Sequence, residues 1–421
     1  MKKVKKKLDI ELLAPAGSYE ALQAAIDNGA DSVYFGIGQI NMRKVAAANF
    51  DFDDLKKIGQ ICRKHKVKTY LTVNTILYDH DLILMRKIID AAKSEKIDAV
   101  IVADMAAVLY AQSIKIPMHI STQVSISNTE AVKFFAQYAD TVVLARELTL
   151  PMIEKITKQI KKEKITGPSG ELVKIEMFAH GALCIAVSGR CSMSLFQYNA
   201  SANRGACQQT CRRKFKVTDE ETNQELVVDN NYIMSPKDIC TIGFLDDFID
   251  AGVQVLKLEG RGRSPEYVAK VVKAYREALI AIENNEYNLD KKVALEAELK
   301  TVFNRGFSDG YYLGRSEQEW AASAGNQSSE EKFFAGVVTN YFSKNKIVEI
   351  QLQAQDTKLG DNFSITGVTT GVVFDKIKSL RNEKEEEIKK ADKKELITIA
   401  LDKKVRKGDK FYLIKKREGS N

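Results

Sequence analysis

Short apolar runs alternate with amphipathic stretches over about the first two thirds of the chain. The runs are rich in β-branched residues and end at Gly or polar turns, which indicates strands, and the stretches between them repeat apolar residues at helical spacing. Helical examples are Ser18–Asn28, Asp53–His65, Asp81–Lys93 and Asn128–Ala136. The predicted strands are Ile10–Ala14, Ser32–Gly36, Lys68–Val73, Ala99–Ala103, Pro117–Ser121, Thr141–Ala145, Lys174–Phe178 and Gln254–Leu258.

Eight strand–helix units of this kind predict an α/β fold, a (β/α)8 barrel of the TIM type, rather than an open doubly wound sheet. No Gly-x-Gly-x-x-Gly motif follows the first strand, so a dinucleotide-binding fold gains no support. Polar residues follow most of the strands directly. The carboxyl ends of the strands in such a barrel surround one mouth, where catalytic groups gather.

We therefore expect catalytic groups at these strand ends, with substrate contacts beside them. Arginine donates a planar fork of N–H groups that suits carboxylates and phosphates, although an ordinary salt bridge is the commoner use of the residue. His180 is either an acid–base group or a hydrogen-bonded structural histidine. The catalytic candidates are His180, Arg146, Glu259 and Arg261, and the substrate-binding candidates are Asn74, Gln123, Arg204 and Arg263.

Five of the six cysteines lie between Cys184 and Cys240. They follow the seventh predicted strand, in an insert of about 70 residues (181–250) where such loops usually have two to six. Turn-forming residues separate the thiols, so loops can bring them together. An iron–sulfur cluster suits this wide, loop-borne spacing better than zinc, whose sites contain closer cysteine pairs. Buried inert thiols are the plain alternative, and disulfides do not suit a chain of cytosolic character.

The pattern changes after the barrel. Ser264 and Pro265 begin a well-marked helix, and residues 318–331, rich in Ala, Ser, Gly and Asn, are typical of a linker. Short strands with Gly turns follow and predict an antiparallel β-barrel. The expected domains are 1–317, a catalytic barrel carrying the insert, the linker 318–331, and 332–421, a C-terminal β-barrel that binds RNA.

Composition and net charge say less about function than the strand ends and the cysteines do. The 421 residues carry a net charge of +8, with basic clusters at Lys2–Lys7, Arg212–Lys214 and Lys403–Arg417 that suit either solvent or an RNA backbone. The basic start is not followed by an apolar segment, and no window has the length and apolarity of a membrane span, so we expect a cytoplasmic protein. His-Glu-x-x-His and Gly-x-Ser-x-Gly motifs are absent from the sequence, which counts against common hydrolases.

The segment Glu176–Ser194, EMFAHGALCIAVSGRCSMS, resembles the signature of peptidase family U32, the collagenase-like proteins. Ten positions carry this match: Glu176, Phe178, Gly181, Ala182, Leu183, Cys184, Gly189, Cys191, Met193 and Ser194. Supporting blocks are Glu11–Gly17, Ala200–Phe215, Met234–Cys240, Leu256–Ser264 and Phe303–Gly314, so the resemblance covers essentially the whole chain.

The resemblance implies a [4Fe-4S] cluster, with zinc as the alternative metal. Its cysteine ligands would correspond to Cys184, Cys191, Cys207 and Cys240, with Cys211 as the alternative fourth ligand. Within the family, the chain is most similar to the group that hydroxylates tRNA wobble uridine to 5-hydroxyuridine without oxygen, with prephenate as the implied hydroxyl source. A paralogous partner subunit is also implied.

Three alternatives remain open at this point. The family name implies a collagenase-like protease of unassigned mechanism. Sibling groups imply hydroxylation of another RNA or of a ubiquinone precursor. A non-catalytic RNA-binding factor with structural zinc is the third.

Overall fold

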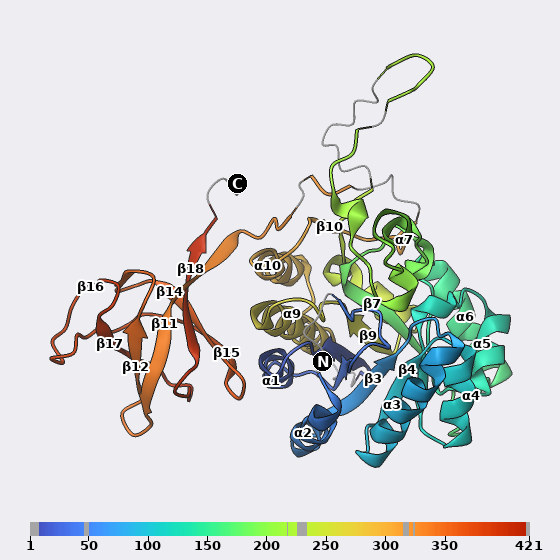
Figure 1. The fold of residues 1–421 in the computed structure, drawn as a ribbon, viewed down its shortest axis with the longest axis horizontal. Helices are drawn as coiled ribbons and strands as arrows, with labels where there is room; N and C mark the ends of the chain where they lie inside the picture. The colour runs from blue at the N-terminus through green and yellow to red at the C-terminus, as the bar shows by residue number, and fades with distance from the viewer. Residues whose placement is uncertain are drawn as a thin grey trace, which may run out of the picture.

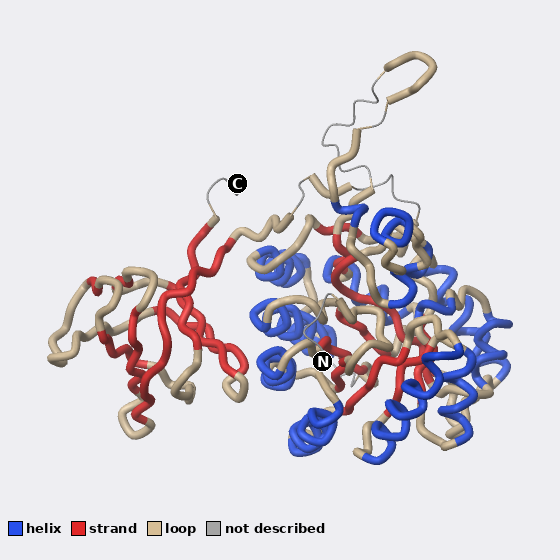
Figure 2. Tube along the Cα trace, viewed as in Figure 1, coloured by secondary structure: helices blue, strands red, loops and turns tan. Residues whose placement is uncertain are grey.

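The computed structural model describes residues 8–45, 50–216, 218–224, 234–314, 320–322 and 325–417. Figure 1 shows a large α/β unit and a smaller all-β unit beside it, and Figure 2 separates the helices from the strands. Each unit has its own apolar core, one built on the barrel strands and one on the C-terminal strands. Within the described residues, no helix is long and apolar enough to cross a membrane.

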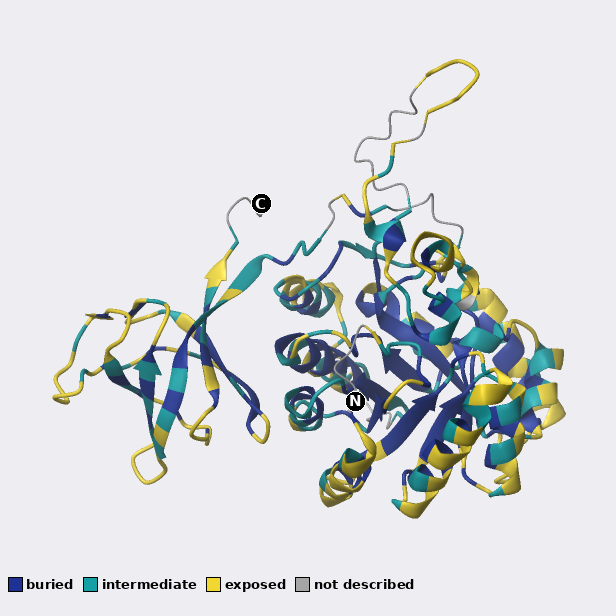
Figure 3. Cartoon of the chain, in the orientation of Figure 1, coloured by how far each residue is buried: buried dark blue, intermediate teal, exposed yellow. Residues whose placement is uncertain are grey.

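The large unit is a closed barrel of eight parallel strands, as predicted. Each strand pairs with its neighbour in chain order, and β9 closes the ring by pairing with both β1 and β7. The barrel strands are almost entirely buried because helices cover them outside and side chains fill them inside (Figure 3). They are β1 (Glu11–Pro15), β2 (Ser32–Phe35), β3 (Lys68–Val73), β4 (Ala99–Val102), β5 (Met118–Ile120), β6 (Thr141–Val143), β7 (Lys174–Ala182) and β9 (Val255–Leu258).

The outer helices begin at residues that cap them. Asp51 and Asp54 form a reciprocal capping box at the start of α2. The Ser264 side chain accepts from the backbone N–H of Tyr267 at the start of α9, and Pro265 is its first residue, as predicted. The helices are α1 (Tyr19–Asp27), α2 (Phe52–Lys64), α3 (Leu82–Ser94), α4 (Met105–Ser113), α5 (Thr129–Ala136), α6 (Leu150–Glu163), α9 (Pro265–Asn284) and α10 (Leu289–Lys300).

The insert between β7 and β9 is built from short pieces rather than long elements. A three-residue strand, β8, pairs antiparallel with the end of β7, and β10 (Phe307–Ser308) pairs with β8. The pairing carries this part of the chain back over the barrel. The pieces are η3 (Val187–Gly189), α7 (Met193–Tyr198), η4 (Ala202–Arg204), η5 (Thr210–Arg212), β8 (Asp238–Cys240), η6 (Ile242–Phe244) and α8 (Leu245–Asp250).

The C-terminal unit is an antiparallel sheet in the order β15-β14-β18-β11-β12-β17, with β13 and β16 paired separately. Arg381, beyond β15, exchanges two backbone hydrogen bonds of 3.0 Å with Thr398 of β17, so the sheet closes on itself as expected of a barrel. The strands are β11 (Glu330–Phe342), β12 (Ile347–Leu352), β13 (Thr357–Lys358), β14 (Asn362–Gly367), β15 (Gly371–Lys376), β16 (Lys390–Ala391), β17 (Leu396–Ala400) and β18 (Lys410–Lys416).

The two units touch through α1 and α9. Val372 of β15 packs against Ala24 and Ala269. The buried carboxylate of Glu266 accepts from Lys332 Nζ and from Thr366 Oγ1, both at 2.8 Å. The C-terminal unit is therefore fixed to the outer helices and leaves the mouth of the barrel free.

Candidate active site at the mouth of the barrel

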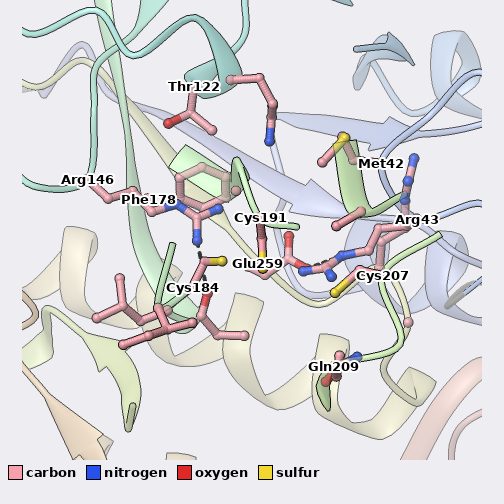
Figure 4. A pocket seen from close by; sticks show the side chains of 18 of the residues that line it. Met42, Arg43, Thr122, Arg146, Phe178, Cys184, Cys191, Cys207, Gln209 and Glu259 are labelled. Atoms are coloured by element: carbon pink, nitrogen blue, oxygen red, sulfur yellow. Dashed lines mark hydrogen bonds and ion pairs between the residues drawn. The ribbon is translucent and has the colours of Figure 1, made fainter. Parts of the chain in front are cut away.

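A cavity of about 200 Å³, hereafter the mouth cavity, opens at the carboxyl ends of the strands beneath the insert. Strand ends form its floor and the cysteine-bearing loops form its wall (Figure 4). The charged, amide and thiol side chains that line it are Arg43, Asn74, Gln123, Arg146, Cys184, Cys191, Cys207, Gln209, Cys211, Arg212, Lys257, Glu259, Arg261 and Arg263.

Four thiols share this cavity. Figure 4 shows Cys184, Cys191 and Cys207 turned toward one another around it, and Cys211 lines it as well. Burial is the main cause that raises the pKa of Cys211, and the three other thiols are close enough to raise it further. Nevertheless, no three His, Cys, Asp or Glu side chains of the described residues are grouped so that they could hold one metal ion.

Cys240 lies elsewhere. It is in β8, opposite His180 of β7, and its buried side chain contacts Tyr275 of α9 and does not line the mouth cavity. Burial raises the pKa of its thiol to about 12. The structure therefore brings Cys211, and not Cys240, to the other three thiols.

Specific contacts position the thiol-bearing loops. Arg212 donates to the carbonyl of Leu183 at 2.6 Å and to Ser235 Oγ at 3.1 Å, which fixes the Cys211 turn beside the end of β7. Gly205 has a φ of +82°, and a Cβ there would lie 2.2 Å from the carbonyl oxygen of Asn41. Only glycine lets η4 approach the loop after β2 this closely, and Cys207 follows two residues later.

Four arginines of the mouth cavity, Arg146, Arg212, Arg261 and Arg263, form no ion pair with a carboxylate among the described residues. Arg261 is 3% exposed and donates to Thr72 Oγ1 at 2.6 Å and to Asn41 Oδ1 at 2.5 Å. Arg146 donates to the carbonyl of Ala182 at 3.1 Å and lies 3.8 Å from the Phe178 ring centroid. In Arg146 and Arg261, the Nε atom is buried without a hydrogen-bond partner in the described structure. Burial lowers the pKa of Arg261 to about 10, so its charge persists at neutral pH.

Glu259 is held ionised in the same wall. Arg43 donates to its Oε1 from Nη2 at 2.6 Å and from Nε at 3.1 Å, and the Tyr34 hydroxyl donates to its Oε2 at 3.1 Å. Burial alone would raise the pKa of Glu259, but Arg43, followed by Arg146, outweighs it and lowers the pKa to about 2. Glu259 is thus ionised at neutral pH, where it forms an ion pair with Arg43 and cannot act as a proton donor.

A second buried carboxylate lies below the floor. Glu176 accepts from Lys257 Nζ at 2.6 Å, and His119 Nδ1 lies 2.7 Å from its other oxygen. Burial would raise the pKa of Glu176, but Lys257 and then His119 lower it to about 2. Lys257 lines the mouth cavity and forms an ion pair with this carboxylate.

The other sequence candidates divide into two groups. Asn74, Gln123 and Arg263 line the mouth cavity, and Asn74 Nδ2 donates to Gln123 Oε1 at 3.3 Å. His180 does not line it: the ring is buried among aromatic side chains, and burial lowers its pKa to about 3. Arg204 also lies outside, where it pairs with Asp81 at 2.6 Å.

The sequence did not predict four residues as members of the site or its surroundings: Arg43, Glu176, His119 and Lys257. Arg43 stands in a loop with no periodicity to place it. Glu176 and Lys257 lie inside apolar strands. A charged residue in such a strand could have indicated a buried ion pair, since a buried charge needs a partner. His119 likewise lies inside β5 and has no motif around it.

The charge of the mouth cavity is strongly positive. Glu259 is its one acidic side chain among the described lining residues, against six arginine or lysine side chains. Arg43 and Lys257 are matched by carboxylates, whereas Arg146 and Arg261 are not. Such a cavity favours a small ligand with carboxylate or phosphate groups.

Comparison with known proteins agrees with the signature in the sequence. The profile of peptidase family U32 matches residues 17–322. A protein of Porphyromonas gingivalis named collagenase is 49% identical over 97% of this chain and 99% of its own length. The tRNA hydroxylation protein P1 of Bacillus subtilis is 30% identical over 94% of this chain and 92% of its own length.

A third relative is a 23S rRNA 5-hydroxycytidine synthase of Escherichia coli. It is 33% identical over 73% of this chain but only 46% of its own length. The profile match and the extent of these alignments lead to one conclusion: this chain belongs to peptidase family U32.

Proposed function

We propose that this protein is an RNA-modifying enzyme that hydroxylates wobble uridine of tRNA to 5-hydroxyuridine without molecular oxygen. The observation that carries the proposal is the mouth cavity, whose lining combines four thiols with the buried Arg261 and the half-buried Arg146, neither of which forms an ion pair with a carboxylate among the described residues. The relatives named for tRNA and rRNA hydroxylation supply the substrate class.

The thiol set suits a [4Fe-4S] cluster. One zinc ion would draw its four thiolates to roughly 2.3 Å from a single point, and the described residues offer no such grouping. A cluster instead takes one thiolate on each iron and spreads them over a larger body. We assign Cys184, Cys191, Cys207 and Cys211 as its ligands, because Cys240 does not line the mouth cavity. When bound, the cluster would supply an electron relay beside the substrates.

The arginines suit an anionic hydroxyl donor. Hydroxylation of uracil C5 replaces C5–H by C5–OH and removes two electrons from the ring, so without oxygen the donor must give up a hydroxyl and accept those electrons. A dicarboxylate such as prephenate fits, since Arg146 and Arg261 can each fork onto one carboxylate. Glu259 keeps Arg43 in place and stays ionised. Asn74 and Gln123 offer neutral amides for the uracil edge.

Analysis of modified nucleosides tests the activity. We expect tRNA from a strain lacking the gene, and any paralogue of it, to lose 5-hydroxyuridine and its derivatives. The wild-type gene should restore them, whereas Arg261→Gln should not, because it removes the unpaired charge but keeps a polar side chain. Unchanged 5-hydroxyuridine in the deletion strain would contradict the proposal.

A protease is the second candidate, because the relative with 49% identity is named collagenase. The mouth cavity gives it little chemistry. No histidine is among the described residues that line it, so a thiol or hydroxyl there has no imidazole base beside it. Cleavage of gelatin or collagen by the purified protein, retained in Cys184→Ala, would favour the protease over the hydroxylase.

A further inference from the structure

The insert also presents an apolar and aromatic surface to solvent. Within α7, Leu195 is 43% exposed, Phe196 85% and Tyr198 44%, and Figure 3 colours much of this short helix as exposed. Large apolar side chains on a surface call for a partner when they gather on one element. We name Leu195, Phe196 and Tyr198 the α7 platform.

The α7 platform begins at the mouth cavity. Met193 and Ser194, the first residues of α7, line the cavity wall. Phe196 is two residues farther on, about 3 Å along the helix axis. A ligand that lies on the platform is therefore next to whatever enters the cavity.

The charge around the platform selects the class of ligand. From Met177 to Thr218 the sequence has six arginine or lysine residues and no aspartate or glutamate. Arg212 is turned inward and Arg204 pairs with Asp81, but Arg190, Arg213, Lys214 and Lys216 are exposed. The Arg213 guanidinium lies 5.3 Å from the centroid of the Tyr198 ring. Exposed aromatic rings among cations, with no acids between them, match the faces and phosphates of unpaired nucleotides.

We propose that the α7 platform binds single-stranded RNA next to the target nucleotide, with bases stacked on Phe196 and Tyr198 and phosphates on Arg213 and its neighbours. This inference rests on the proposed function and deepens it. The target base must leave its stack to reach a cavity beneath a loop, and the platform offers its neighbours a replacement stack. A loop, rather than a duplex, is the form of RNA that can do this.

The test compares Phe196→Ala with Phe134→Ala. Phe134 is a matched control, since it is 49% exposed on α5 and α5 lies on the outer wall of the barrel. Binding of a fluorescent tRNA anticodon stem-loop and of a blunt duplex with the same stem would be measured by anisotropy at several salt concentrations. We expect Phe196→Ala to weaken binding of the stem-loop about fivefold or more, with little change for the duplex. Phe134→Ala should bind as wild type does.

Two further variants separate stacking from charge. Phe196→Trp should keep the affinity, because it keeps a stacking face, and Arg213→Ala should lower the slope of log affinity against log salt by about 0.7. If wild type binds the stem-loop and Phe196→Ala binds it with the same affinity, this inference is overturned but the proposed function is not. If wild type does not bind the stem-loop, both this inference and the proposal of an RNA substrate are overturned. Dissociation of a dimer by Phe196→Ala, without an effect on RNA, would assign the platform to a second copy of the chain and overturn the inference.

Discussion

Unmatched positive charge is the feature that defines the mouth cavity at the scale of single residues. Arg43 and Lys257 each meet a buried carboxylate, so their charges are balanced within the protein. Arg261 is 3% exposed, more buried than Arg43, but its guanidinium donates to the neutral oxygens of Thr72 and Asn41. A buried charge without a counter-charge is costly unless a ligand supplies one. The contribution of a balanced charge to stability can be tested at the ion pair between Arg43 and Glu259.

Glu259→Gln is expected to lower the free energy of unfolding by about 3 kcal/mol at neutral pH, because it removes the counter-charge of Arg43. The pKa of Glu259 is about 2 in the folded protein, below its ordinary value of 4.5. The contribution is therefore complete above about pH 4.5 and is lost as the pH falls toward about 2. Urea unfolding at neutral pH and at about pH 3 should show the gap between variant and wild type narrowing in acid.

The control for this prediction is Glu130→Gln, whose side chain is 80% exposed on α5. It should stay within about 0.5 kcal/mol of wild type at both pH values. An undiminished gap for Glu259→Gln in acid would mean that the carboxylate charge is not what stabilises this wall.

At the scale of elements, the insert depends on close approaches between loops rather than on helix packing. Gly205 in its left-handed conformation lets η4 lie against the loop after β2. Arg212 then ties η5 to the end of β7. These two contacts hold Cys207 and Cys211 on the cavity wall, so a side chain at position 205 should disturb the proposed cluster site from a distance.

Gly205→Ala is expected to lower the melting temperature by roughly 2–4 °C, since a left-handed alanine costs about 1–2 kcal/mol, and to reduce the iron bound per chain. Gly243→Ala is the matched control, because a Cβ there would meet nothing within 4 Å. Iron assays and thermal melts of both variants check this. Full iron content in Gly205→Ala would show that the approach of η4 does not position Cys207.

The strands show which parts of the fold could be predicted from the sequence. All eight barrel strands were predicted, because each combines an apolar run with flanking turns. The strands β8 and β10 were not, since two or three residues carry no periodicity and exist only through pairing with β7 and with each other. The C-terminal sheet was predicted from its Gly turns, but its strand β11 begins at Glu330, inside the expected linker.

At the scale of the whole molecule, the barrel brings together groups that are far apart in the chain. Arg43 follows β2, Arg146 follows β6, and Glu259 and Arg261 follow β9, while the thiols come from the insert after β7. The strand ends predicted Asn74, Gln123, Arg146, Glu259 and Arg261 at the mouth, because barrel closure puts all carboxyl ends on one side, but they also predicted His180, which does not line it, and missed Arg43. The strand ends could not predict the partners of these residues, since loop conformations pair Arg43 with Glu259 and turn Arg204 away toward Asp81.

His180 and Cys240 show the same limit at this scale. Both lie where β7 and β8 pair, and both side chains are buried beside Tyr275 of α9 rather than lining the cavity. His180 is a sequence candidate because of its place at a strand end and Cys240 because of the family resemblance, and neither argument shows whether the side chain lines the cavity. The choice between Cys211 and Cys240 is therefore the sharpest consequence of the structure for the proposed chemistry.

Iron and sulfide assays on anaerobically purified protein test the central claim most directly. We expect about four irons and four sulfides per chain in the wild type, a loss of both in Cys211→Ala, and retention of both in Cys240→Ala and in the buried control Cys62→Ala. Wild-type protein that remains free of iron after anaerobic reconstitution, or iron that is lost from Cys240→Ala and kept in Cys211→Ala, would contradict the account.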